Sequence, residues 1–239
     1  MSFDLPRNVI LPVDAVDVRL VASPHPFERD NQTAIAENWR REMEMKPALY
    51  DGTVVLLSAL SYRDSRLIGR CHAVKYSTFM LWRKNRELSG AEHAYAHAVL
   101  VAGDNALVAI RMGSHTVNAG RVYFAAGSFE PIDFRDGLVD IDFNMIREVG
   151  EETGIDLSGA ARGQRYYALS TSSGTVIFRR FRVAEPADEI AQHIKMFVAA
   201  EADPEIEGPV IIRNATDLPV GLMGHMKPLI KWHFANELV

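Results

Sequence analysis

The sequence is poor in cysteine and in long apolar runs. Cys71 is the only cysteine among 239 residues, which excludes an internal disulfide and a cysteine-based zinc site. We expect its thiol to be a small buried apolar group in a reducing cytoplasm. No run approaches the ~20 apolar residues that a membrane-spanning helix needs, and the first residues lack a basic segment followed by an apolar one. We therefore expect a cytoplasmic protein without a membrane segment.

An excess of basic residues is also missing. The formal net charge is -5 at pH 7, which argues against nucleic acid or an anionic membrane as the partner. A small molecule that carries phosphate would need local Lys, Arg or a metal ion. Apolar residues make up 48% of the chain and charged residues 24%, so the chain can build a substantial core.

Hydrophobic periodicity and turn signals predict a mixed set of helices and strands. Ile35, Trp39 and Met43 recur on one face of a helix that begins after Asp30 or Asn31 and ends before a proline. Strands are predicted at 17–22, 53–60, 67–74, 94–101, 106–111, 122–126, 165–169, 175–183 and 209–212, helices at 30–45, 79–85, 141–153, 187–200 and 222–237, and a loop rich in Pro, Gly and Asp at 130–142.

The segment REVGEETG, residues 147–154, gathers three glutamates on one predicted helix. Glu148 and Glu152 are one turn apart and Glu151 lies beside them, so their oxygens can converge on one volume. The helical wheel predicts a carboxylate face that includes Asn144, opposite a core face of Phe143, Ile146, Gly150 and Thr153 with Val149 at its edge. Oxygen ligands without His or Cys favour Mg²⁺ or Mn²⁺ over zinc. The alternative is a solvated acidic face. Gly154 suits the left-handed cap that ends the helix.

This segment resembles the second half of the Nudix hydrolase box, G-x5-E-x7-R-E-u-x-E-E-x-G-u with u aliphatic. Residues 147–155 match that half at every fixed position. The upstream AAGSFEP resembles the family's loop before the catalytic helix, with Gly127 standing for the first glycine and Glu130 in the same loop. The resemblance implies an α/β fold, a Nudix α/β/α sandwich with a mixed sheet, and hydrolysis of a pyrophosphate with Mg²⁺, for which Mn²⁺ substitutes.

By the same resemblance, Glu148 and Glu152 are the main metal ligands, and Glu151 is a further ligand or positions water. Arg147 orients these glutamates. The backbone carbonyl of Ala126 is a further metal ligand.

A general base is expected from elsewhere in the fold. Glu205 and Glu207 are candidates because family members often place an acidic group in this region. Two exposed acids without a catalytic role are the alternative.

The box departs from the family pattern in its first half. Val139 occupies the position of the first box glutamate, and the first glycine lies about six residues too far upstream, which indicates an inserted loop. Either an aspartate substitutes for that glutamate in holding Arg147, the candidates being Asp136, Asp140 and Asp142, or Arg147 is held in a different way. A glutamate introduced at position 139 is expected to leave activity unchanged or to raise it.

The N-terminal part resembles a divergent Nudix branch that includes the animal UDP-glucose and UDP-galactose diphosphatase. The likeness lies in NWRREMEMKPALYDGTVVLL and in YSTFMLWRKNR, and it implies a nucleotide sugar that is cleaved to a nucleoside monophosphate and a sugar 1-phosphate. Aromatic candidates for base stacking are Tyr76, Phe79, Trp82 and Tyr123, and basic candidates for phosphate binding are Arg83, Lys84 and Arg121. Each of them alone also fits a packing or surface role.

Alternative functions stay open. They are a pyrophosphatase for ADP-ribose, a dinucleotide or coenzyme A, a non-catalytic nucleotide-sensing module, and a purely structural acidic helix. His93 and His97 would form a metal pair on a helix, but their segment is predicted to be a strand, which favours structural histidines. We expect residues 1–91 to be an N-terminal α/β extension that sets specificity and residues 92–239 to be the Nudix domain. Dimers are common in the family, and a homodimer remains open.

Overall fold

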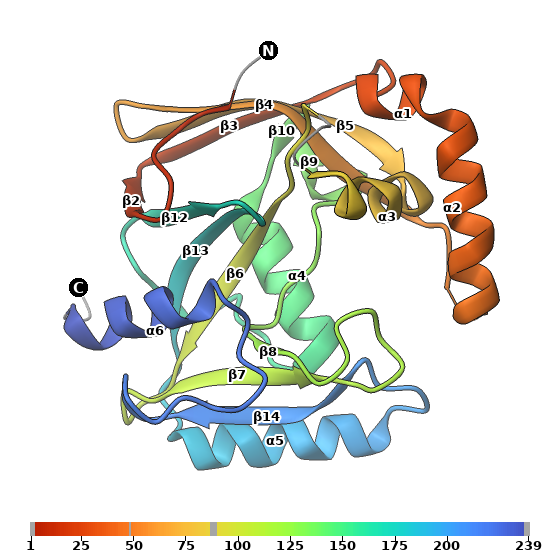
Figure 1. The fold of residues 1–239 in the computed structure, drawn as a ribbon. Coiled ribbons are helices and arrows are strands. Elements are labelled where there is room, and N and C mark those ends of the chain that lie inside the picture. The colour runs from red at the N-terminus through yellow and green to blue at the C-terminus, as the bar shows by residue number, and fades with distance from the viewer. Residues whose placement is uncertain (1–2, 48, 87–89, 237–239) are drawn as a thin grey trace. The chain divides into compact units, whose positions relative to one another are not determined.

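The chain forms two compact units from segments that alternate along the sequence. Figure 1 labels their helices and strands. Unit 1 comprises Met1–Tyr95, Ser128–Ile141 and Ala168–Thr175, and unit 2 comprises Ala96–Gly127, Asp142–Tyr167 and Val176–Val239. The computed structural model describes residues 3–47, 49–86 and 90–236. The predicted boundary at residues 91 and 92 divides the sequence in two, whereas each of these units draws on three separate segments.

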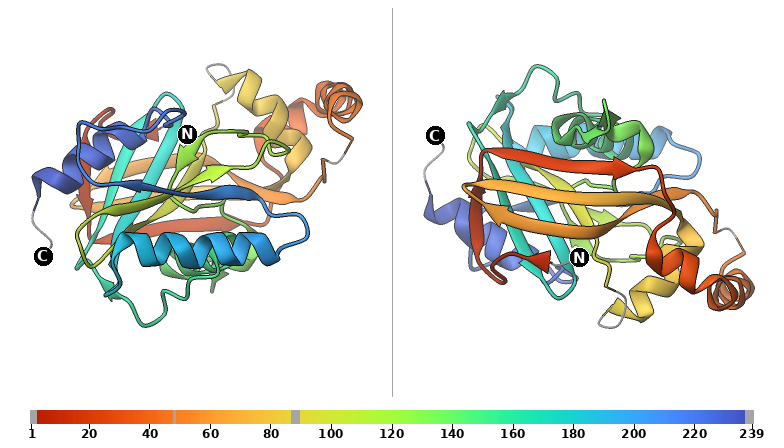
Figure 2. Two further views of the ribbon diagram at one scale, coloured as in Figure 1. Left: turned by 90° about the horizontal axis from the view of Figure 1, so that it is seen from below. Right: turned by 90° about the horizontal axis from the view of Figure 1, so that it is seen from above.

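Unit 1 is built on a mixed sheet. Its strand order is β1 (Phe3–Asp4), β4 (Thr53–Arg63), β5 (Arg66–Lys75), β3 (Ala15–Val21), β10 (Leu138–Val139) and β9 (Phe134–Arg135). The hairpin of β4 and β5 turns at Asp64 and Ser65, whose φ angles are 49° and 56°, and β3 pairs with β5 in parallel. These three long strands lie side by side in Figure 2, right. Cys71 is fully buried on β5, as predicted.

The remaining elements of unit 1 are α1 (Pro26–Asp30), α2 (Gln32–Met45), α3 (Tyr76–Lys84), η2 (Pro131–Asp133) and β2 (Ile10–Val13), which is the neighbour of β12 (Tyr166–Thr171). The α2 helix ends before Pro47, as predicted, but its most buried residues are Ile35, Asn38 and Glu42. The two polar residues are buried because both contact Lys84 of α3, the carboxyl of Glu42 at 2.5 Å and the amide oxygen of Asn38 at 2.6 Å. Side-chain pairing, which periodicity does not reveal, therefore sets the buried face.

Unit 2 contains the strands β14 (Ile206–Ile212), β7 (Leu107–Met112), β6 (Ala94–Val101) and β13 (Gly174–Arg182) in this order, with β8 (Val122–Tyr123) on β7 and β11 (Ala161–Arg162) on β13. Its helices are α4 (Ile141–Thr153), α5 (Ala187–Ala200) and α6 (Met226–Ala235). The α5 helix lies along β14 (Figure 2, left). Pro228 falls in the first turn of α6, where a proline does not kink a helix. The predicted α/β class is confirmed.

The segment predicted as the loop 130–142 is ordered secondary structure instead. It contains η2 and the β9–β10 hairpin, and β10 pairs with β3 through Leu138 opposite Arg19. The hairpin turns at Asp136 and Gly137, whose φ angles are 49° and 76°, as a two-residue turn between antiparallel strands requires. Val139 is buried in this hairpin at 7% exposure.

None of the helices in the described part of the chain is long and apolar enough to cross a membrane.

Candidate active site on helix α4

The α4 helix has the predicted bounds, but its buried face differs from the prediction. Glu148 and Glu152 are 8% and 7% exposed, next to the core residues Met145 and Val149, whereas the side chain of Glu151 is 59% exposed. The predicted carboxylate face is therefore wrong for two of its three glutamates. At the end of the helix, Gly154 has a φ of 71° and its N–H donates to the Gly150 carbonyl at 2.9 Å, which confirms the predicted left-handed cap.

A short loop that contains Ala126 and Gly127, in unit 2, covers the two buried glutamates. The backbone N–H of Ala126 donates to Oε2 of Glu152 at 2.9 Å. A Cβ at position 127 would overlap all three carboxylate atoms of Glu148, so Gly127 allows the backbone to lie against this carboxylate. The sequence resemblance paired this glycine with the glutamate helix, and the structure brings them into contact. The predicted role of the Ala126 carbonyl as a metal ligand stays a prediction.

Arg147 connects the buried and the exposed glutamates. Its Nη2 lies 2.7 Å from Oε1 of Glu148, and its Nη1 lies 2.8 Å from Oε2 of Glu151. The arginine side chain is itself only 15% exposed, so the Glu148 carboxylate is held in a fixed position.

Asp142 is bound elsewhere. It accepts from Nη1 of Arg179 at 2.9 Å, from Nη1 of Arg162 at 2.9 Å and from the hydroxyl of Tyr166 at 2.8 Å. Its expected role in holding Arg147 is therefore taken by Glu148 and Glu151. The other two candidate aspartates, Asp136 and Asp140, belong to unit 1.

The electrostatic environment of the site opposes the ionised form of Glu152. Burial raises the pKa of the Glu152 carboxyl well above its ordinary value, and the negative charges of Glu205 and Glu148 raise it further. The N–H of Ala126 acts in the opposite direction. Two buried carboxylates and a third acid nearby form a place where a positive charge would lower the free energy.

Glu205 belongs to this environment, as the sequence predicted, although the residue is exposed. Desolvation of its carboxyl raises the pKa of Glu205, while His115 lowers it. The Glu205 carbonyl accepts from the Gly113 N–H at 2.9 Å, which ties the two loops together. Glu207 is exposed on β14. His115 could not be found from the sequence, because no spacing rule relates it to a glutamate 90 positions along the chain.

Fewer metal-binding side chains lie together in the described residues than the sequence predicted. Within residues 3–47, 49–86 and 90–236, no three His, Cys, Asp or Glu side chains are gathered in a geometry suited to one metal ion. Glu148 and Glu152 are the two buried carboxylates, and Glu151 points to solvent in its ion pair with Arg147.

Comparison with known proteins gives distant structural matches. No family model and no curated protein matches the sequence. Among solved structures, the chain is similar to a MutT protein from Methanosarcina mazei Go1, with 16% identity over 59% of this chain and 91% of that one and a TM-score of 0.39. It is also similar to a protein from Deinococcus radiodurans (14% identity, 59% and 83% covered, TM-score 0.40) and to a NUDIX hydrolase from Nitrosomonas europaea (18%, 51% and 72%, TM-score 0.32). Scores at this level assign the chain to no family.

The aromatic candidates of unit 1 are largely core residues. Trp82 is 2% exposed and its Nε1–H donates to the Ala91 carbonyl at 3.1 Å. Phe79 is packed in the same cluster, so neither ring offers a face to a nucleobase. Tyr76 is half-buried and stacks on Phe79 at a centroid distance of 5.7 Å. Arg83 is half-buried, whereas Lys84 is exposed and paired with α2.

The unit 2 candidates differ in exposure. Arg121 is exposed, whereas Tyr123 is 7% exposed and its hydroxyl accepts from Nδ2 of Asn118 at 3.2 Å. His97 lies on a strand, as predicted, and its ring stacks on His225 at 5.1 Å.

Two further residues of unit 1 have structural contacts. Nε2 of His93 lies 3.1 Å from the Ser128 hydroxyl. Glu130 is the N-cap residue of η2, and its N–H donates to Asp133 at 2.8 Å.

Proposed function

We propose that this chain is a divalent-metal-dependent pyrophosphohydrolase of the Nudix type. The observation that carries the proposal is the contact between the 126–127 backbone and the two buried glutamates. This contact joins the loop and the helix that the box pattern places together, with a glycine where a side chain would displace Glu148. A structural acidic helix would have no use for a glycine at this point.

The residues fit a magnesium ion that the substrate helps to bind. Mg²⁺ is usually held by one or two carboxylates together with waters and substrate phosphates, and Glu148 and Glu152 supply two. The absent Cβ of Gly127 lets the backbone lie against the Glu148 carboxylate, and the charge on Glu152 is destabilised until a cation arrives. When bound, the metal would neutralise the pyrophosphate and lower the pKa of a bound water.

The chain's own residues have distinct roles in this proposal. Arg147 fixes the carboxylate of Glu148 and holds Glu151 outward, so the acid that reaches solvent is placed to orient water. The N–H of Ala126 fixes Glu152. These contacts preorganise the two ligands before substrate arrives, which lowers the reorganisation that binding requires.

Glu205 is the stronger of the two candidates for general base. Its raised pKa brings the carboxyl closer to the working pH, which favours proton transfer at neutral pH. His115 next to it supplies a second titratable group. Glu207 shares no such environment on the exposed side of β14.

The substrate that we propose is a nucleotide sugar such as UDP-glucose, split into a nucleoside monophosphate and a sugar 1-phosphate. The N-terminal resemblance supports this choice. Tyr76, Arg83 and Arg121 remain the candidate contacts, because Arg121 is exposed and the other two are half-buried. Trp82 and Phe79 are withdrawn as base-stacking residues, since both belong to the core.

The deciding experiment is a hydrolysis panel with Mg²⁺ or Mn²⁺, in which products are separated by chromatography. UDP-glucose, UDP-galactose, GDP-mannose, ADP-ribose, a diadenosine polyphosphate and coenzyme A are compared. UMP from the UDP-sugars supports the whole proposal. Cleavage centred on another compound keeps the reaction and replaces the substrate, and no cleavage of any compound favours a sensing module.

Glu152→Gln tests the metal site within the same assay. The amide keeps the size of the side chain but loses its charge, so we expect turnover to fall by at least ~10²-fold while the fold persists. Glu189→Gln, an exposed acid on α5, is the matched control and should retain full activity. Full activity in Glu152→Gln would remove this residue from the site.

A further inference from the structure

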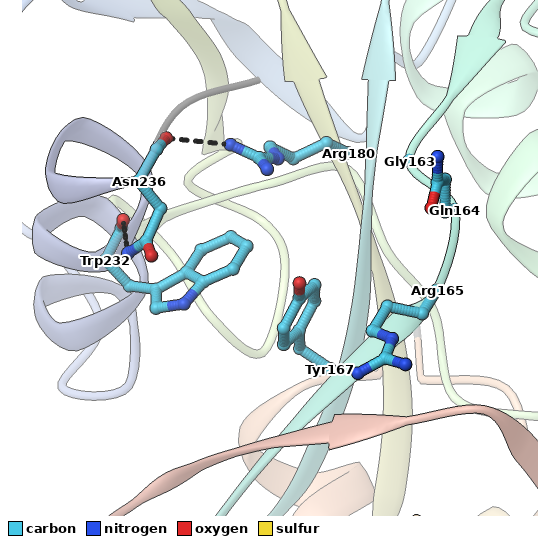
Figure 3. Close-up of a pocket in the computed structure, with 7 residues that line it drawn as sticks. All are labelled: Gly163, Gln164, Arg165, Tyr167, Arg180, Trp232 and Asn236. Atoms are coloured by element: carbon cyan, nitrogen blue, oxygen red, sulfur yellow. Dashed lines mark hydrogen bonds between the residues drawn. The ribbon is translucent and has the colours of Figure 1, made fainter. Parts of the chain in front are cut away.

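A pocket on α6 lies outside the glutamate site. It is lined by Gly163, Gln164, Arg165, Tyr167, Arg180, Trp232 and Asn236, all of unit 2, and encloses about 310 Å³ (Figure 3). We call it the Trp232 pocket. Its volume is at the lower end of the range for small-molecule sites, which suits a ligand of mononucleotide size and not a dinucleotide.

The pocket and the glutamate helix use different faces of β13. Neighbouring residues on a strand point to opposite faces. Arg179 contacts Asp142 of α4 at 2.9 Å, whereas Arg180 donates to the Asn236 carbonyl at 3.1 Å and lies 4.9 Å from the Trp232 ring centroid. The Trp232 pocket is therefore on the face away from α4, and a ligand there would not compete for the glutamates.

One wall of the pocket is aromatic and fixed in place. The Trp232 and Tyr167 ring centroids are 4.4 Å apart, and both rings contact Phe178, which is fully buried behind them. A half-buried tryptophan held by two other rings offers a flat apolar surface at little cost in side-chain entropy. Any planar ring system can stack against such a surface.

Two arginines also line the pocket, and the guanidinium of one of them, Arg180, lies over the Trp232 ring. Arg180 is 8% exposed, and desolvation lowers the pKa of its guanidinium, so an anion would be favoured beside it. Arg165 is exposed and lines the pocket just before β12 begins. Guanidinium groups bind phosphate with two parallel hydrogen bonds.

We propose that the Trp232 pocket binds a nucleoside monophosphate, with the base against Trp232 and Tyr167 and the phosphate toward Arg165 and Arg180. Aromatic rings and two guanidinium groups within one small volume match the base and the phosphate of such a molecule. The proposal does not depend on hydrolysis at α4, because the pocket requires neither the glutamates nor a metal ion.

The test is isothermal titration of AMP and UMP into the Glu152→Gln protein in EDTA, where the glutamate site cannot hold a metal. We expect one saturable site. Arg165→Ala and Trp232→Leu should each weaken binding about tenfold, and adenosine, uridine and inorganic phosphate should each bind more weakly than the nucleotides. Thermal unfolding identifies any variant that fails to fold, and the exposed Arg165 keeps the test usable if Trp232→Leu does.

Two matched controls complete the experiment. Arg182→Ala removes an exposed arginine of β13, and Lys231→Ala removes an exposed cation of α6, both outside the pocket lining. Both should bind the nucleotides as the parent does. The proposal is overturned if no saturable binding is seen, if Arg165→Ala and Trp232→Leu leave affinity unchanged, or if phosphate alone binds as tightly as AMP.

Discussion

Glu152 has a carboxyl whose pKa is raised first by burial and then by neighbouring acids. The ordinary value for such a group is 4.5, so the folded chain holds a proton at pH values where the unfolded chain has released it. A raised carboxyl pKa makes the free energy of unfolding fall as pH rises from the unfolded value through the folded one. The metal-free protein should therefore lose stability on going from about pH 4.5 toward neutral pH.

This dependence can be measured by urea unfolding of the metal-free protein across pH 4.5–8. Glu152→Gln should be more stable than the parent at pH 8, by ~1.4 kcal/mol for each unit by which the folded pKa is raised, and the gain should vanish near pH 4.5. Mg²⁺ should stabilise the parent at pH 8 and leave Glu152→Gln unaffected. If the parent and Glu152→Gln were equally stable at every pH, the Glu152 carboxyl would not have the raised pKa assigned to it.

Gly127 is the second residue on which the site depends. In Gly127→Ala the new Cβ displaces the Glu148 carboxylate, which lies at the end of a flexible side chain, so the fold can adapt while the ligand moves. We expect a loss of stability of ~0.5–3 kcal/mol, because the buried Glu148–Arg147 ion pair is disturbed, together with a loss of metal-dependent turnover of at least ~10²-fold.

Gly159→Ala is the matched control for that substitution. A Cβ at position 159 meets no atom within 4 Å, and the residue has no positive φ. Activity and unfolding should both stay at the level of the parent. Equal activity in the two alanine variants would show that the approach of Gly127 to Glu148 has no role in the reaction.

At the scale of elements, the β9–β10 hairpin changes what a glutamate at position 139 would do. The sequence suggested that Val139→Glu would leave activity unchanged or raise it, by restoring a box residue. The structure buries Val139 in β10, where a carboxylate would lose its hydration. We now expect the variant to lose ~1–3 kcal/mol of stability, measured by urea unfolding. Ile132→Glu, at a 55% exposed residue of the same segment, should lose less than ~0.5 kcal/mol.

The elements that the sequence predicted best are those with long, uninterrupted patterns. The bounds of α4, α5 and β6 agree with the prediction at both ends. Two-residue strands such as β9 and β10 have too few residues for a periodic signal. β10 forms because β3, more than a hundred positions away, offers it a partner, and β9 pairs with β10.

The candidate site was predictable in its residue types but not in its burial. Nothing in a helical wheel shows that a glycine loop will cover Glu148 and Glu152, because that contact joins segments some twenty residues apart. For Trp82 the sequence left both a stacking and a packing role open, and the structure shows the packing role, because an aromatic residue of a core cluster has the same sequence pattern as one that binds a base.

At the scale of the whole molecule, the interleaved segments predict the behaviour of fragments. Residues 1–91 contain β3, β4 and β5 but lack β10 and β9, which continue the same sheet. Without them β3 has an open edge, so this fragment should show no cooperative unfolding transition and should aggregate. Circular dichroism during urea titration provides the measurement. A fragment that unfolds cooperatively would instead support the boundary at residue 91.

The pairing of β10 with β3 also sets an order of events during protein synthesis. Leu138, the partner of Arg19, leaves the ribosome about 120 residues after it, an interval of ~6–24 s at the usual rates of elongation. Throughout that time the first sheet has an uncovered edge strand that other nascent chains can join. The exposure of this edge strand therefore ends only when the inserted hairpin, which interrupts the box, has been synthesised.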